Sequence, residues 1–232
     1  MKSVFVTGTD TGVGKTIVAG LLARYLREQG HRAITQKWVQ TGTRDYPCDI
    51  PVHLELMGVE RGTAGQHEQD MNPYAFELAG SPHLAASCEG ARIDVRKIVA
   101  SFRRLEEAFD AVIVEGAGGV LVPLSRRKLL VDVVERLGLP VVVVAANKLG
   151  AINHTLLTVE ALRVRDIKVL GIVFNTLDEK EDETVLQDNP EIVKAFARVP
   201  ILGQLAWSKD TEQLQRDFRP IAKKVLAGLS RT

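Results

Sequence analysis

The sequence predicts one α/β domain, a doubly wound and mostly parallel sheet with helices on both faces. Apolar runs alternate along the chain with segments of helical period, which is the pattern of parallel βαβ units. The apolar runs are continuous rather than alternating, as in strands that are covered on both faces. The length of 232 residues suits one such domain and is too short for two, so residues 1–232 are assigned to a single domain.

The expected strands and helices follow in chain order from these runs. A strand at 3–7 leads into a glycine-rich turn, and a helix follows from Lys15 to Gln29, where Gly30 ends it. The later strands are expected at 33–38, 111–115, 140–146, 168–175 and 199–205, and two further helices at 151–165 and 219–229.

Two segments do not follow this alternation. Residues 39–90 are rich in glycine, proline, histidine and single charges, and they come directly after a predicted strand. Long insertions at the carboxyl ends of strands are where α/β proteins place substrate contacts, so this segment is the expected substrate region. Residues 176–190 are acidic, and the sequence predicts a solvated loop there.

Composition and charge exclude several classes of protein. The 30 basic and 29 acidic residues give a net charge of +1, so nothing favours nucleic acid or an anionic membrane as a partner. No apolar stretch has the length of a membrane span, and the N-terminus lacks the apolar core of a signal peptide. Cys48 and Cys88 form no disulfide framework, and the five histidines lack zinc-ligand spacing. We expect a cytoplasmic protein.

The strongest motif is a phosphate-binding loop at residues 4–16, VFVTGTDTGVGKT. A strand enters a glycine-bearing turn, and Gly14-Lys15-Thr16 begins a helix whose N-terminal N–H groups converge on phosphate. Lys15 is expected at the β- and γ-phosphates, and the Thr16 hydroxyl at Mg²⁺. Gly8 lies one residue earlier than the usual GxxxxGK[ST] spacing requires, so the loop is a variant of the P-loop.

Two kinds of nucleotide switch fit this loop poorly. GTP-binding switches recognise guanine through NKxD, but after Asn147-Lys148 this chain has Gly150 in place of the aspartate. Partitioning and cell-division ATPases carry a signature lysine in the loop where this chain has Asp10, and an aspartate supplies no second phosphate-binding cation.

The loop and five later segments resemble the dethiobiotin synthetase family. TGTDTGVGKT at 7–16 is similar to that family's phosphate loop, and the later similarities come in the family's order over nearly the whole chain. Trp38 stands where the family usually has proline, and Ala206 stands where it often has proline before a tryptophan. The later segments are KWVQTG at 37–42, NPY at 72–74, SPH at 81–83, VEGAGG at 114–119 and KLGAINH at 148–154.

The resemblance, together with the predicted strand ends, implies a set of site residues. Lys15 and Lys37 are the expected catalytic cations, because ATP and a carbamate are both anionic. Thr16, Asp49 and Glu115 are the expected magnesium ligands, with Asp45 and Glu55 left open as rivals of Asp49. The expected ATP-binding residues are Thr11, Gly12, Val13, Gly14, Lys15, Thr16, Ile17, Asp49, Glu115, Gly116, Ala117, Gly118, Asn175, Thr176, Leu205 and Ala206, and the expected substrate residues are Thr41, Ile152 and Asn153. Ser81, His83 and His154 are taken as structural.

The resemblance also implies a reaction. The family joins 7,8-diaminononanoate and CO₂ with the help of Mg²⁺ and ATP, giving dethiobiotin, ADP and phosphate in biotin biosynthesis. It further implies a homodimer in which the KLGAINH segment of one subunit completes the substrate site of the other. A P-loop ATPase that switches partner proteins and a related amide ligase are the alternatives.

Overall fold

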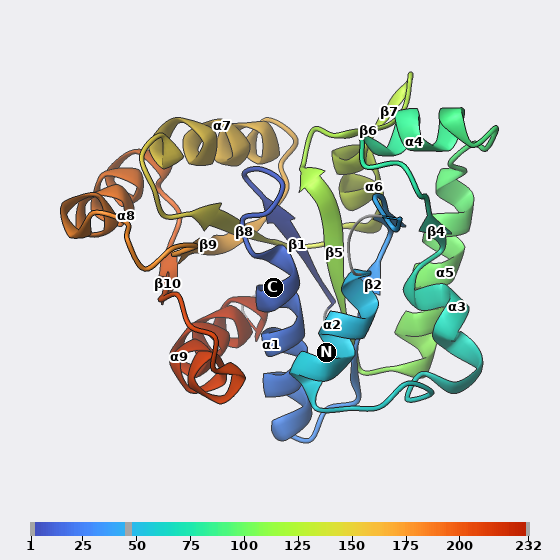
Figure 1. The fold of residues 1–232 in the computed structure, drawn as a ribbon, viewed down its shortest axis with the longest axis horizontal. Coiled ribbons are helices and arrows are strands. Elements are labelled where there is room, and N and C mark those ends of the chain that lie inside the picture. Colours follow the sequence, from blue (N-terminus) through green and yellow to red (C-terminus); the bar gives the residue numbers. More distant parts are fainter. Residues whose placement is uncertain (1–2, 45–47, 231–232) are drawn as a thin grey trace.

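A six-stranded parallel sheet forms the centre of the computed structural model, which describes residues 3–44 and 48–230 (Figure 1). The strand order is β10-β9-β8-β1-β5-β2, so β1 lies in the middle and the phosphate loop that follows it is at the centre of the sheet's carboxyl edge. The strands are β1 (Val4–Gly8), β2 (Ala33–Lys37), β5 (Ala111–Gly119), β8 (Val141–Ala146), β9 (Val169–Asn175) and β10 (Ile201–Leu205).

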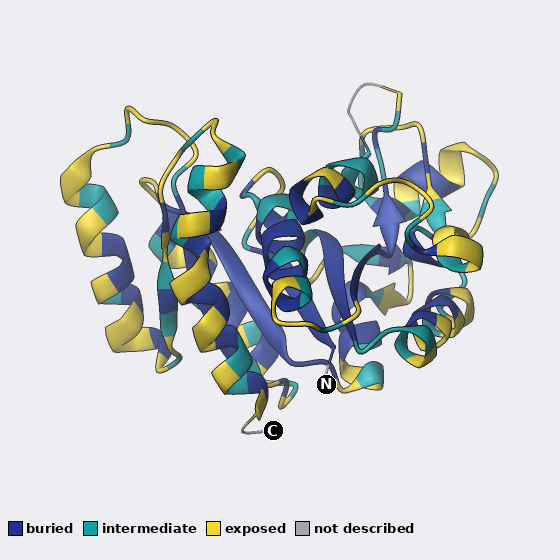
Figure 2. Ribbon diagram, turned by 90° about the horizontal axis from the view of Figure 1, so that it is seen from below, coloured by how far each residue is buried: buried dark blue, intermediate teal, exposed yellow. Residues whose placement is uncertain are grey.

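Helices cover both faces of this sheet, as right-handed crossovers require. On one face α1 contacts both α2 and α9, while α5 contacts α6 and α7 contacts α8 on the other (Figure 1). The central strands are buried almost throughout, and exposed residues gather on the outer sides of the helices (Figure 2). These helices are α1 (Lys15–Glu28), α2 (Asp49–Met57), α5 (Val95–Ala108), α6 (Leu130–Leu137), α7 (Ala151–Arg163), α8 (Glu183–Ala197) and α9 (Thr211–Ser230).

The long insertion after β2 contains short elements rather than a single irregular loop. A two-residue strand pair, β3 (Val39–Gln40) with β4 (Tyr74–Ala75), continues from the end of β2, and α2 begins at Asp49. Three short helices complete it: η1 (Gly65–His67), α3 (Glu68–Met71) and α4 (Pro82–Cys88). Beyond β5, a small antiparallel pair is formed by β6 (Pro123–Ser125) and β7 (Lys128–Leu129).

The predicted fold class and the chain order of the main strands are confirmed, whereas several elements differ from the prediction, and α5 and α6 were not predicted. The solvated loop predicted at 176–190 is wrong in its second half, because α8 begins at Glu183. Asp182 caps this helix by accepting the N–H of Thr184 at 2.8 Å, and Asn189, on its inner face, is buried. α9 begins at Thr211, eight residues before the predicted start, and β5 continues to Gly119, four residues beyond the predicted end of that strand. No helix among the described residues is both long and apolar enough to cross a membrane.

Trp38 belongs to the core rather than to the site. Its ring is fully buried and tilted against Phe5 at 4.9 Å between centroids, and its indole N–H donates to Gln36 Oε1 at 3.0 Å. The indole therefore fills core space beside Phe5 of β1, at the position directly after Lys37 where the resembling family usually has proline.

Candidate active site

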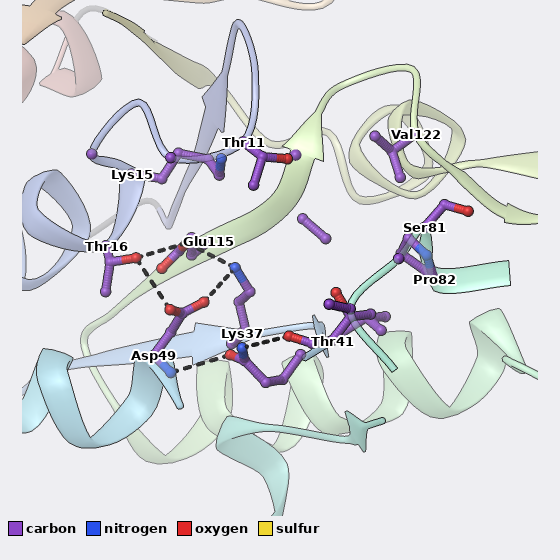
Figure 3. A pocket seen from close by; sticks show the side chains of 18 residues that line it. Thr11, Lys15, Thr16, Lys37, Thr41, Asp49, Ser81, Pro82, Glu115 and Val122 are labelled. Atoms are coloured by element: carbon purple, nitrogen blue, oxygen red, sulfur yellow. Dashed lines mark hydrogen bonds and ion pairs between the residues drawn. The ribbon is translucent and has the colours of Figure 1, made fainter. Parts of the chain in front are cut away.

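A cavity of about 760 Å³ lies at the carboxyl edge of the sheet, beside the phosphate loop. Its walls come from the loop and α1, from the ends of β2 and β5, from α2 and from residues 79–82 (Figure 3). Ser81, taken as structural from the sequence, lines the side of this cavity away from Lys15. The predicted residues that line it are Thr11, Gly12, Gly14, Lys15, Thr16, Lys37, Thr41, Asp49, Glu115, Ala117 and Gly118.

The phosphate loop is compact because two glycines allow close approaches. A Cβ on Gly8 would lie 2.7 Å from the carbonyl oxygen of Asp10 and 2.7 Å from Val13, which explains a glycine one position earlier than usual. Gly14 has a φ of 96°, and a Cβ there would lie 2.1 Å from the amide nitrogen of Asn175. The Lys15 ammonium donates to the Asp10 carbonyl at 2.9 Å.

Lys37, Glu115, Asp49 and Thr16 form one cluster at the floor of the cavity (Figure 3). The Lys37 ammonium lies 2.7 Å from Glu115 Oε1 and 2.6 Å from Asp49 Oδ2, and it also donates to the Gly116 carbonyl at 3.0 Å. The Thr16 hydroxyl lies 3.2 Å from Glu115 Oε1 and 3.3 Å from Asp49 Oδ1. The structure thus joins four predicted residues from four separate elements.

The cluster shifts the pKa values of its charged groups. Burial alone would raise the pKa of Glu115, but the Lys37 cation and the hydrogen bond to His53 overcome it and lower this pKa to about 2. Burial would likewise lower the pKa of Lys37, yet Glu115 and Asp49 raise it above its ordinary value. Burial and the neighbouring Lys37 lower the pKa of Lys15 to about 8. Lys37 is therefore held charged, whereas the Lys15 ammonium has no carboxylate at hydrogen-bond distance within residues 3–44 and 48–230.

The structure separates two of the three acidic candidates in the insertion, Asp49 and Glu55. Asp49, the first residue of α2, lines the cavity and contacts Lys37, while its N–H donates to Gln40 Oε1 at 3.1 Å. Glu55 is exposed and does not line the cavity, and Asp45 lies outside the described residues. Among the described residues, no group of three or more histidine, cysteine, aspartate or glutamate side chains is arranged to hold a metal ion.

Four of the predicted ATP-binding residues, from the ends of β9 and β10, do not line the cavity. Asn175 ends β9 and donates its amide to the Val13 carbonyl at 3.0 Å. Thr176 donates its N–H to the Leu205 carbonyl at 2.9 Å, and Ala206 next to Leu205 is exposed. Ile152 and Asn153 lie in the first turn of α7 and are not among the residues that line the cavity of the same chain.

Three polar residues near the site were not predicted from the sequence. Asn72 of the NPY segment donates to the Lys37 carbonyl at 2.9 Å and so fixes the end of β2. Asn147, which the sequence marks only as part of an incomplete guanine motif, donates to Gln204 at 3.1 Å and accepts from Asn189 at 2.9 Å, which ties α8 to the strand ends. His53 contacts Glu115 at 2.7 Å. The signal in the sequence that could have identified His53 is its position four residues after Asp49, because residues with this spacing lie on the same side of a helix.

Comparisons with known proteins identify the family. A family model described as an AAA domain matches residues 2–215. The ATP-dependent dethiobiotin synthetase BioD of Chlorobaculum tepidum is 41% identical over 227 residues, covering 93% of this chain and 92% of the relative. The chain belongs to the ATP-dependent dethiobiotin synthetase family. A second member, from Anaeromyxobacter dehalogenans, is 40% identical over 216 residues, covering 93% and 95% of the two chains. The dethiobiotin synthetase resemblance of the loop and the ordered motifs is confirmed.

Solved structures show how widely the fold is shared. The septum site-determining protein MinD of Pyrococcus horikoshii, solved with Mg-ADP, superposes with a TM-score of 0.60 at 17% identity, covering 99% and 98% of the two chains. ParA of pNOB8, solved with nonspecific DNA, gives a TM-score of 0.59 at 11% identity, covering 99% of each chain. These likenesses show the P-loop ATPase fold alone. They do not favour the switch alternative, since the dethiobiotin synthetase relatives share far more of the sequence.

Proposed function

We propose that this chain is an ATP-dependent cyclo-ligase that makes dethiobiotin from 7,8-diaminononanoate, CO₂ and ATP. The observation that carries the proposal is the pairing of a P-loop with a buried lysine in one cavity, where Lys37 and Lys15 face the same space (Figure 3). The names of the relatives, ATP-dependent dethiobiotin synthetases, support it. The proposed reaction forms carbon–nitrogen bonds at the expense of ATP, as expected of a ligase that makes dethiobiotin in biotin biosynthesis.

The bond changes follow from the three substrates. One amine of the diamine adds to CO₂ and gives a carbamate, whose oxygen attacks the γ-phosphate of ATP and expels ADP. The second amine then attacks the carbonyl of the mixed anhydride, closes the five-membered ureido ring and releases phosphate. Lys15 and Lys37 are the catalytic cations in this proposal, because both lie where anionic carbamate and phosphate must approach each other.

ATP is proposed to bind along the loop and over the strand ends beside it. Residues 11–17 surround the phosphates with backbone N–H groups at the start of α1, while residues 116–118 border them from β5. Asn175, Thr176, Leu205 and Ala206 form the adenine side in this proposal, with the Asn175 amide group as the base-recognising group. The hydrogen bond of Asn175 to Val13 supports a link between base recognition and the loop.

Magnesium is proposed at Thr16, Asp49 and Glu115. The donors fit this ion, since one hydroxyl and two carboxylates converge, and Mg²⁺ takes only one or two protein carboxylates beside substrate phosphates. The Lys37 ammonium lies 2.6 Å from Asp49 Oδ2 and 2.7 Å from Glu115 Oε1, and this supports a site where the two carboxylates attract positive charge. When bound, the ion would neutralise phosphate charge.

The substrate site is proposed to be completed in a homodimer. Thr41 lines the cavity, whereas Ile152 and Asn153 lie outside the cavity of their own chain. A carboxylate anchored at the first turn of α7 in a second copy suits a long aliphatic acid, because the helix N-terminus offers free N–H groups. We keep the cytoplasm as the proposed compartment and propose neither a nucleic acid nor a membrane as partner.

The direct test is incubation with ATP, bicarbonate and 7,8-diaminononanoate, followed by mass detection of dethiobiotin and by measurement of ADP. We expect one ADP for each dethiobiotin formed. A chain that hydrolyses ATP without forming the ring would overturn the proposal, and the variant Lys15→Met serves as the control for contaminating activity.

A further inference from the structure

His53 is a buried histidine in contact with the cluster, and no step above uses it. Its imidazole is fully buried on α2, and Nε2 lies 2.7 Å from Oε2 of Glu115, which is also buried. The other ring nitrogen, Nδ1, is the single buried side-chain nitrogen or oxygen without a hydrogen-bond partner in the part of the chain that the structure describes. Buried polar atoms of this kind are rare and call for an explanation.

The two contacts of Glu115 determine where the imidazole proton is. Glu115 is ionised, with a pKa of about 2, so both of its oxygens accept hydrogen bonds and the proton of the pair belongs to His53 Nε2. Nδ1 has no hydrogen-bond partner among the described residues, so the polar contact of this ring is the one made by Nε2. The geometry is that of an Nε2–H group donating to the Glu115 carboxylate.

The two oxygens of the Glu115 carboxylate have different partners. Oε2 of Glu115 accepts from His53, while Oε1 faces the Lys37 ammonium at 2.7 Å and the Thr16 hydroxyl at 3.2 Å. Asp49 and His53 are four residues apart on α2, so they project from the same side of this helix. One helix thus holds both carboxylates of the cluster, Asp49 directly and Glu115 through His53.

We propose that His53 is a positioning residue that orients Glu115 and thereby sets the affinity of the ATP-bound site for its divalent cation. The inference rests on the proposed function, since it takes Glu115 as a metal ligand. Groups that orient a ligating carboxylate change metal affinity by roughly 10- to 100-fold when they are removed. The alternative is that His53 only fills space between α2 and the sheet.

The experiment compares three substitutions that differ in where they place a donor. His53→Gln puts an amide nitrogen near the position of Nε2, His53→Asn puts one near Nδ1 and too far from Glu115, and His53→Leu keeps volume without a donor. Binding of Mn²⁺ to each protein with saturating ATP is followed by electron paramagnetic resonance, and the Mg²⁺ concentration for half-maximal turnover is measured beside it. His67→Leu, which removes an imidazole outside the cavity, is the control.

We expect the Mn²⁺ dissociation constant and the Mg²⁺ requirement to rise at least about tenfold in His53→Asn and His53→Leu, and to stay within about threefold in His53→Gln. Equal metal affinity in Gln, Asn and wild type, at similar melting temperatures, would overturn the inference and leave His53 as packing. The Gln–Asn comparison stands even if His53→Leu fails to fold. Because Mn²⁺ binding does not require ring closure, a wild-type protein that binds metal and ATP but makes no dethiobiotin refutes the proposed function alone.

Discussion

Lys37 and Glu115 are register partners on the adjacent parallel strands β2 and β5, and the Lys37 ammonium lies 2.7 Å from Glu115 Oε1. Both side chains are almost completely buried. Backbone pairing therefore places a cation and a carboxylate side by side at the edge of the sheet, and each depends on the other to be ionised there.

The first prediction concerns the stability of this pair. Removing the cation in Lys37→Met leaves Glu115 charged and buried, so we expect the free energy of unfolding to fall by about 3–5 kcal/mol. The double variant Lys37→Met/Glu115→Gln should recover much of this loss, because neither partner is then charged. Urea unfolding of the two variants measures the difference, and both should be inactive. A Lys37→Met protein as stable as wild type would show that the carboxylates find another cation.

Lys15 is expected to behave differently, because among the described residues its ammonium donates to the Asp10 carbonyl and to no carboxylate. Lys15→Met should lower kcat/KM by at least about a hundredfold, close to 3 kcal/mol of transition-state stabilisation, while the unfolding curve changes little. Turnover and thermal unfolding are measured on the same preparation. A large loss of stability, or a nearly normal rate, contradicts this assignment.

Nucleotide binding should take up a proton near pH 8. In the free protein burial and Lys37 lower the pKa of Lys15 to about 8, so Lys15 is half neutral at that pH. The anionic phosphates favour the charged form and raise this pKa on binding, so binding weakens as the pH rises above 8. Calorimetry with ATP and EDTA in two buffers should give uptake of about half a proton at pH 8 and clearly less at pH 7. The same uptake at both pH values would assign the proton to another group.

Asn175 is expected to contribute to the choice of base. Asn175→Ala should reduce the preference for ATP over GTP by roughly tenfold, the value of about one lost hydrogen bond to a buried group. Because the Asn175 amide also donates to Val13, binding of tripolyphosphate, which has no base, is measured as the control. Equal losses for ATP, GTP and tripolyphosphate would mean that Asn175 supports only the loop.

Shared sites predict complementation between two inactive chains. Lys37→Ala and Asn153→Asp homodimers should both be inactive. In a mixed dimer, one of the two sites combines the intact Lys37 of one chain with the intact Asn153 of the other. An equal, randomly exchanged mixture should therefore regain about a quarter of wild-type activity. The mass in solution is measured at the same concentrations. A fully active monomer, or no recovery in confirmed mixed dimers, would refute the shared site.

The sequence by itself determined the features that depend on neighbouring residues. The phosphate loop occupies 13 consecutive positions, 4–16, and its chemistry follows from their order because the backbone of one short segment makes the site. The continuous apolar runs predicted the main strands, and the ordered motifs predicted the family. The loop predicted at 176–190 was wrong from Glu183 onward, because charges on the outer side of α8 hid the few residues that pack inward, such as Asn189 and Val193.

Only the tertiary structure decided which distant side chains meet. Thr16 and Glu115 are 99 residues apart in the chain, and His53 and Glu115 are 62 apart, yet each pair is in contact. The pairing of β1 and β2 with β5 brings Thr16 and Glu115 together, and the packing of α2 against α1 and β2 brings His53 to Glu115. The choice of Asp49 over Glu55 depended on which side of α2 faces the cavity. The pKa of Glu115 depended on burial and on partners from two other elements, and no local pattern in the sequence contains that information.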